Sequence, residues 1–249
     1  MSSNRLSPEL DKNYHRSHLT NKIRIWLLSL VYFLKLQLNK NYFKILMHKS
    51  HLQQVEDYVL SILTERTPIQ NKYHSVAHTR DVVNSSIEIG IGEKLTPDEM
   101  EMVQIAAWFH DIGYIEKSED HEEISAMYAS NFLSEGNYPS DRIESIISCI
   151  LATKVPQKPK NKLEEIICDS DLNHIGREIF FKRNDIFRLE YENHIGRKLT
   201  EYEWITKTID FVTRHRFFTK YALKNFSEQK KENLRILQEQ LDQIINQSK

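Results

Sequence analysis

A histidine and an aspartate stand side by side at the end of an apolar run, as His110 and Asp111. Residues 106–109 read Ala-Ala-Trp-Phe, and Gly113 follows two residues after the aspartate. Buried polar groups cost free energy unless they are paired or bind a metal ion. The doublet therefore predicts either a hydrogen-bonded pair in the core or half of a metal site.

Three residues elsewhere in the chain favour the metal site. His74 and His78 are four residues apart, which predicts that they lie on one helical face, one turn apart. The chain has 11 His, so this pair indicates little by itself, but Asp171 adds a distant carboxylate. Imidazole and carboxylate together suit Zn, Mn, Fe or Co, and Mg less well. We therefore expect one or two divalent ions.

The elements that must position these residues are expected to be helices. Breakers are few, with 6 Gly and 6 Pro in 249 residues, and no stretch alternates apolar and polar residues as a strand does. Apolar periodicity and start signals predict helices over about residues 53–66, 76–90, 97–109, 121–134, 140–152, 163–171, 177–192, 200–214 and 218–247, the last as one helix or two. The predicted fold is all-α, with the ligands held in the core of a helical bundle.

Two of these helix starts are marked by their residues. The run Thr-Pro-Asp-Glu at residues 96–99 has a capping threonine, a proline at the first helical position and an acid at the third. Ser75 is expected to cap the helix that carries His78.

The bulk composition is that of an ordinary globular protein, with 40% hydrophobic and 28% charged residues and a net charge of −1. Because the chain is not basic overall, we expect no nucleic-acid partner. Cys149 and Cys168 form no Cys-x-x-Cys pair. A reduced, cytoplasmic chain with both thiols buried is predicted, and a disulfide between them is the alternative.

Residues 1–47 look like an extension ahead of a main domain over residues 48–249. Residues 25–34 of the extension form an apolar run between Arg24 and Lys35. The run is shorter than the roughly 20 residues that span a bilayer, and no small-residue cleavage site follows it. We predict a helix that packs on the domain or on a partner. The alternative is peripheral contact with an anionic membrane surface through the basic residues of 22–44.

The ligand order of His78, then His110-Asp111, then Asp171 resembles that of the HD-domain superfamily of metal-dependent phosphohydrolases. Residues 73–78, Tyr-His-Ser-Val-Ala-His, also resemble the Tyr-His-Asn-x-x-His signature of class I cyclic-nucleotide phosphodiesterases, with serine in place of asparagine. The segments at 106–114, 121–126, 150–154 and 168–177 look like a bacterial group of small predicted HD hydrolases. The resemblance covers roughly residues 50–245. The doublet alone is a weak motif, but the ordered four-part set is a strong one.

The resemblance implies specific roles at the metal centre. The residues that it implies bind the first ion are His78, His110, Asp111 and Asp171. Asp111 would also bridge to a second ion. His121 lies where some two-metal members place another ligand, and a histidine that merely begins a helix is the alternative. Those members have a further histidine where this chain has Ala-Thr-Lys at residues 152–154, which argues against a fully occupied second site.

The same resemblance implies hydrolysis of a small phosphate ester, such as a nucleotide or cyclic nucleotide. A bound divalent ion lowers the pKa of water toward about 7 and makes hydroxide available for in-line attack on phosphorus. The leaving oxygen needs a proton, and His74 is the implied general acid. This favours a diester, although a supporting role for His74 is the alternative.

Several further residues are candidates for binding substrate or supporting the site. Lys154 and Arg177 are expected to bind the substrate phosphate. Further cationic candidates are Arg214, His215, Arg216 and Lys220. The neighbouring phenylalanines, Phe217 and Phe218, are expected in the core. Asp81 is expected to orient a ligand imidazole and Asp169 to act as a cap.

Two competing interpretations remain at this point. The first is a non-catalytic metal- or nucleotide-binding module that regulates a partner. The second is a membrane-associated helical protein in which the motif is coincidental. An enzyme should lose turnover when His110 or Asp111 becomes alanine, whereas a binding module would keep its partner function after loss of His74.

Overall fold

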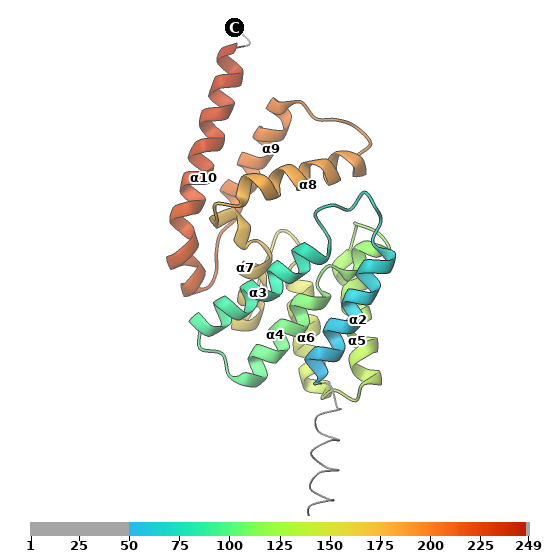
Figure 1. Cartoon of the computed structure of the whole chain (residues 1–249). Helices are drawn as coiled ribbons and strands as arrows, with labels where there is room; N and C mark the ends of the chain where they lie inside the picture. The colour runs from blue at the N-terminus through green and yellow to red at the C-terminus, as the bar shows by residue number, and fades with distance from the viewer. Residues whose placement is uncertain (1–49, 248–249) are drawn as a thin grey trace, which may run out of the picture. The chain divides into compact units, whose positions relative to one another are not determined.

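The computed structural model describes residues 50–247, and within them every regular element is a helix (Figure 1). The helices are α2 (His51–Arg66), α3 (Val76–Gly92), α4 (Pro97–Phe109), α5 (His121–Glu135), α6 (Ser140–Ala152), α7 (Lys162–Asp171), α8 (Phe180–His194), α9 (Glu201–Arg214) and α10 (Lys220–Gln247), with short 3₁₀ helices η1 (Ile112–Ile115) and η2 (Asn173–Gly176). The all-α prediction is confirmed, and the C-terminal stretch forms one helix.

The extension predicted over residues 1–47, with its apolar run and its membrane contact through residues 22–44, lies outside the described residues. The domain boundary near residue 47 therefore stays a prediction. Within residues 50–247, no helix combines the length and apolar character that a bilayer span requires.

The helix starts show one confirmed cap and one correction. Thr96 Oγ1 accepts a hydrogen bond from the Glu99 backbone N–H at 3.3 Å, and the Glu99 carboxylate accepts one from the Thr96 N–H at 2.8 Å. Ser75 does occupy the position before α3, but the capping role predicted for its side chain is wrong. Its hydroxyl instead donates to the Tyr73 carbonyl at 3.2 Å.

Helix α4 is the central element of the bundle formed by α2 to α7. It packs against α2, α3, α5, α6 and α7. Its last five residues, 105–109, are all apolar, and Ile105, Ala106, Ala107 and Phe109 are fully buried. Burying a large apolar side chain stabilises a fold by about 1.5–3 kcal/mol, so this packing fixes the end of α4 in space. His110 and Asp111 follow directly.

The C-terminal helices form a second, looser layer. Figure 1 shows α8 and α9 lying beyond the bundle and the long α10 running along their side. A smaller core joins α9 and α10 to η2 through Ile175, Ile205, Val212 and Leu237. Asp169 of α7 accepts hydrogen bonds from the Phe218 and Thr219 backbone N–H groups at 2.8–3.2 Å. This carboxylate therefore caps the chain just before α10, as the sequence predicted.

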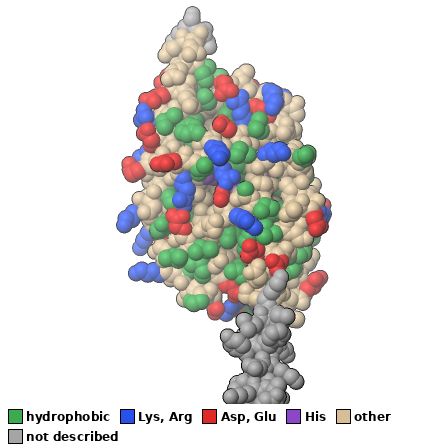
Figure 2. All heavy atoms as spheres, viewed as in Figure 1, with side chains coloured by type: hydrophobic (Ala, Val, Ile, Leu, Met, Phe, Trp, Pro, Cys, Tyr) green, Lys and Arg blue, Asp and Glu red, His purple; other side chains and the backbone are tan. Residues whose placement is uncertain are grey.

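The described surface carries mixed charge. On the face drawn in Figure 2, Lys and Arg side chains are interspersed with Asp and Glu side chains among hydrophobic ones. Cys149 and Cys168 are buried free thiols, so the disulfide alternative is wrong.

Candidate metal centre and the cavity above it

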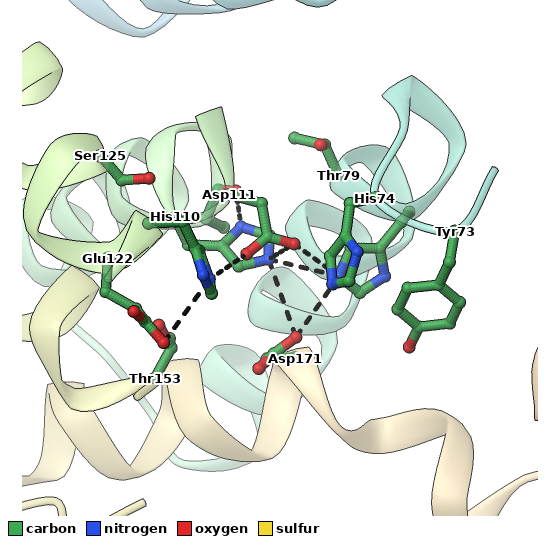
Figure 3. Close-up of polar contacts among 12 residues, drawn as sticks. Tyr73, His74, Thr79, His110, Asp111, Glu122, Ser125, Thr153 and Asp171 are labelled. Carbon is green, nitrogen blue, oxygen red and sulfur yellow. Dashed lines mark hydrogen bonds and ion pairs between the residues drawn. The ribbon is translucent and has the colours of Figure 1, made fainter. Parts of the chain in front are cut away.

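Four side chains from three helices converge on one small space (Figure 3). His78 comes from α3, His110 and Asp111 from the end of α4, and Asp171 from the last residue of α7. The Nε2 atoms of His78 and His110 lie 3.3 Å apart. Asp111 Oδ2 lies 3.2 Å and 3.0 Å from these two nitrogens, and Asp171 Oδ1 lies 3.4 Å and 3.7 Å from them.

Local structure aims the His110 ring at this space. The residue follows the last turn of α4 and is fully buried. Its Nδ1–H donates to the Ala107 carbonyl at 2.8 Å, so Nε2 is the nitrogen that faces the other ligands. A hydrogen bond at one ring nitrogen that leaves the other as a ligand is the usual arrangement at metal sites.

The donor set fits a divalent metal ion. The side chains of His78, His110 and Asp171 form a group whose ligand atoms lie within 4.8 Å of one another. Asp111 Oδ2 is buried beside them and accepts no hydrogen bond from the described residues. A buried carboxylate oxygen without a donor is costly, and a cation would satisfy it. Two imidazoles with two carboxylates suit a transition-metal ion.

The electrostatics of the four side chains are those of a strongly coupled cluster. Burial alone would lower the pKa of His78, but the neighbouring Asp111 and Asp171 carboxylates outweigh it and raise the pKa to about 9. Burial alone would raise the pKa of Asp111, but His110, with His121 and His78, lowers it well below its usual range. The Asp111 carboxylate is therefore held ionised at the point where a cation would bind.

His121 lies on the far side of the Asp111 carboxylate. Its Nε2 is 3.3 Å from Asp111 Oδ1, and its Nδ1–H donates to the Ser118 carbonyl at 2.9 Å. His121 is also the first residue of α5, so it begins a helix and faces the centre at once. The buried Glu122 carboxylate is 3.5 Å from the same Nε2. At the position of the missing histidine, Thr153 donates to the Ile150 carbonyl and offers no nitrogen ligand.

His74 borders the centre. The spacing predicted that it shares a helical face with His78, and this prediction is wrong. His74 precedes α3, because the Tyr73 and His74 backbone N–H groups donate to the Glu190 carboxylate at 2.7 Å and 3.2 Å and draw the chain away from helical geometry. The His74 Nδ1 also bonds to Glu190. Burial alone would raise the pKa of Glu190, but these hydrogen bonds with His74 and Tyr73 lower it.

Two residues of this region were missed by the sequence reasoning. Glu190 comes from α8, 116 residues after His74, and no local pattern marks it. Tyr114 lies between two imidazoles, stacked on His74 with ring centroids 3.6 Å apart and tilted against His121 at 4.0 Å. Tyr114 does belong to the apolar motif that carries the doublet, so its proximity to Asp111 was the available signal.

A cavity of about 630 Å³ opens above the centre. Its floor includes His74, Asp111, His121 and Asp171. A second part of its lining, the aromatic wall, comes from α8, α9 and the segment after α9, and the aromatic residues there are Phe180, Phe187, Tyr191, Trp204, Phe211 and Phe218. Phe217 is buried in the core as predicted, whereas its neighbour Phe218 lines the cavity. Sequence reasoning missed the aromatic wall.

The structure does not bring the two predicted phosphate-binding residues to this cavity. Lys154 Nζ lies 2.7 Å from both Asp120 and Glu123. The Arg177 guanidinium pairs with Glu88 at 2.6 Å. Neither residue lines the cavity, and the substrate-binding role of both stays a prediction.

Asp81 was predicted to orient a ligand imidazole, and this prediction is wrong. Its carboxylate pairs with Arg183 on α8 and is half exposed. The reason is geometric: the residue lies one turn along α3 from His78 but faces α8.

The fold and site together define an α-helical domain with a buried centre suited to a divalent metal ion. The family model of the HD domain matches residues 76–237, and the chain therefore belongs to the HD-domain family. The resemblance of the ordered His, His-Asp and Asp set is thereby confirmed. Family membership supports a metal-dependent hydrolase.

Solved structures agree on the fold. A predicted HD superfamily hydrolase from an uncultured Thermotogales bacterium is 18% identical, with a TM-score of 0.51 over 83% of this chain and 99% of that one. Bacillus subtilis YpgQ in complex with ADP is 18% identical, with a TM-score of 0.55 over 77% of this chain and 94% of that one. A Lactobacillus plantarum protein is 16% identical, with a TM-score of 0.57 over 81% of this chain and 98% of that one. Curated proteins give no sequence match.

Proposed function

We propose that this protein hydrolyses a phosphate ester of a nucleotide in a reaction that depends on a divalent metal ion. The observation that carries the proposal is the buried Asp111 Oδ2, which has no hydrogen-bond donor and lies 3.0–3.2 Å from two imidazole nitrogens. This donor-rich centre forms the floor of a cavity large enough for a nucleotide.

The residues that would hold the ion are His78, His110, Asp111 and Asp171, with His121 a further ligand if a second ion binds. When bound there, a divalent ion would lower the pKa of water toward about 7 and polarise the phosphoryl oxygens. The protein's own contribution is to fix these donors on the ends of helices in a tightly packed bundle. Such rigidity preserves the alignment of water and phosphorus that in-line attack requires.

His74 is the proposed general acid for the leaving oxygen. The Glu190 carboxylate holds its Nδ1, and Tyr114 stacks on the ring face. With Nδ1 engaged, Nε2 is the atom from which a proton passes to the departing alkoxide. Because an alkoxide is a poor leaving group, this transfer contributes more for an alkyl ester than for an aryl ester.

The nucleotide part of the proposal rests on the aromatic wall. Phe187, Tyr191 and Phe211 line the same cavity as Asp111 and Asp171. A purine or pyrimidine can stack on such rings whatever its identity, and each stack contributes about 1–3 kcal/mol. The structure of YpgQ with ADP, a protein of the same fold, gives this choice of ligand independent support.

A panel of phosphate esters tests the proposal. Purified protein loaded with Mn²⁺ should release phosphate or alcohol from at least one nucleotide ester, and Asp111→Asn should release none. Glu93→Gln, a change outside the cavity, is the control. Nucleotide binding without turnover of any ester, under Mn²⁺, Fe²⁺, Co²⁺ and Zn²⁺ in turn, would overturn the proposal and favour a regulatory module.

A further inference from the structure

The lining of the cavity beside the aromatic wall carries positive charge. Lys207 and Arg214 on α9, and Arg216 in the segment that follows, line the cavity beside the aromatic wall. These basic residues lie on elements that contribute no proposed metal ligand. They form a separate feature of the same cavity.

The three cations differ in whether their charge is compensated. Arg214 pairs with Asp210 at 2.8 Å. Lys207 and Arg216 are exposed, and within residues 50–247 neither makes an ion pair with a carboxylate. Each rests instead on an aromatic ring: Lys207 Nζ lies 4.9 Å from the Tyr191 ring centroid, and the Arg216 guanidinium carbon 5.3 Å from that of Phe218. An aromatic face positions a cation without neutralising its charge.

His215, which lies between Arg214 and Arg216 in the sequence, has a side chain without a hydrogen-bond partner among the described residues. Both ring nitrogens of His215 are buried, and neither makes a hydrogen bond within the described part of the chain. Burial, with the nearby charge of Lys230, lowers the pKa of His215 to about 3, so the ring is neutral at physiological pH. A neutral imidazole carries one donor and one acceptor, and leaving both buried and unpaired costs free energy that a ligand would recover.

We propose that Lys207 and Arg216, with His215 next to Arg216 in the chain, bind a second anionic group of the substrate, distinct from the phosphate that is hydrolysed. The inference rests on the proposed function and narrows its substrate class to nucleotides with more than one phosphate group. The divalent ion and its four ligands account for one phosphate. Two uncompensated cations in the lining of the same cavity suit another, because guanidinium and ammonium groups donate charge-assisted hydrogen bonds to phosphate oxygens.

The test compares substrates that differ in their second phosphate. The probes are ADP and ATP, which carry it in a chain, adenosine 3′,5′-bisphosphate, which carries it across the sugar, and p-nitrophenyl phosphate, which lacks it. Lys207→Ala combined with Arg216→Ala is compared with Lys220→Ala combined with Lys224→Ala. The control pair removes two lysines of α10 that do not line the cavity.

The quantity measured is the ratio of kcat/KM for each nucleotide to that for p-nitrophenyl phosphate. In the Lys207/Arg216 double variant, we expect the ratio to fall by about 10- to 100-fold for at least one of the three nucleotides, mainly through KM. The control pair should change it by less than about twofold. An unchanged ratio for all three nucleotides in the Lys207/Arg216 variant would overturn the inference.

Binding separates this inference from the proposed function. Calorimetric Kd values for AMP and for the three nucleotides, measured with Mn²⁺ present, require no turnover. The Lys207/Arg216 variant should weaken one of the three by at least tenfold more than it weakens AMP. Equal weakening of all four overturns the second anion site even when hydrolysis is observed, whereas selective weakening supports the site even when no ester is cleaved.

Discussion

The floor and the outer wall of the cavity are built in different ways. On the floor, His78, His110 and Asp111 are buried at helix ends that a dense core holds in place, and their charges face one another. On the wall, Phe211 and Lys207 are exposed, and α9, the helix that carries them, packs mainly against α10. The contrast suits the proposed division of labour, with chemistry at the buried centre and recognition on the more exposed wall.

Removal of a floor ligand should have the largest effect. His110→Ala deletes a fully buried imidazole whose Nε2 faces three other donors. We expect turnover of every ester to fall at least about 10³-fold, because the metal-dependent step is lost for all substrates alike. Steady-state kinetics on the ester panel measures this. If His110→Ala reduced the turnover of nucleotides alone and left small esters unaffected, the metal centre would not carry the chemistry. That result would contradict the proposed division of labour between floor and wall.

His74→Ala should reduce kcat by about 10²–10⁴-fold while the metal content stays that of the wild type, because the residue supplies a proton and no ligand. Glu190→Gln should cost about 10–100-fold, since it disturbs the orientation of the ring. The double variant should be no slower than His74→Ala, because Glu190 acts through His74. Metal loss in His74→Ala, measured by elemental mass spectrometry, would instead make His74 a ligand.

The difference in packing predicts a difference in stability. Phe109 on the floor side is fully buried, and Phe187 on the wall is 36% exposed. Phe109→Ala should lower the free energy of unfolding by about 3–5 kcal/mol through the lost transfer energy and the cavity that remains. Phe187→Ala should lower it by less than about 1.5 kcal/mol. Urea unfolding of both variants checks the contrast, and equal losses would contradict it.

The same contrast explains what the sequence could reveal. The floor was predictable, because His110-Asp111 ends an apolar helix and packing dictates where that helix lies. The wall was not predictable from the sequence. Glu190 reaches His74 from another helix, and no sequence pattern distinguishes it from a solvent-exposed carboxylate on α8. Lys154 was predicted from its place at the end of an apolar helix, and Arg177 from its place just after the Asp171 segment. In three dimensions each pairs with a carboxylate outside the cavity.

The loop that joins α8 and α9 should respond to acid. Hydrogen bonds from Lys198, Arg188 and the Leu199 N–H hold the pKa of Glu192 at about 2. Because this value lies below that of the unfolded chain, near 4.5, the stabilisation is complete above about pH 4.5 and is lost as the pH falls toward 2. Wild type should therefore exceed Glu192→Gln in urea midpoint at pH 7, and the gap should shrink below pH 4.5. A gap independent of pH would rule out this role.

The smallest effect is expected at Lys154. Its ammonium group pairs with Asp120 and Glu123 outside the cavity, so Lys154→Ala should change kcat/KM for nucleotides by less than about threefold. Kinetics beside Lys207→Ala, which removes a cation that lines the cavity, gives the comparison. A larger loss for Lys154→Ala than for Lys207→Ala would restore the phosphate-binding role predicted from the sequence.

The most direct test of the metal centre is the metal content of the purified protein, with wild type beside Asp111→Ala, measured by elemental mass spectrometry after loading with Mn²⁺, Fe²⁺ or Zn²⁺. We expect about one or two ions per chain in the wild type and their loss in the variant, with the helical circular dichroism of both unchanged. A wild-type chain that stays free of metal after all three loadings would contradict this expectation.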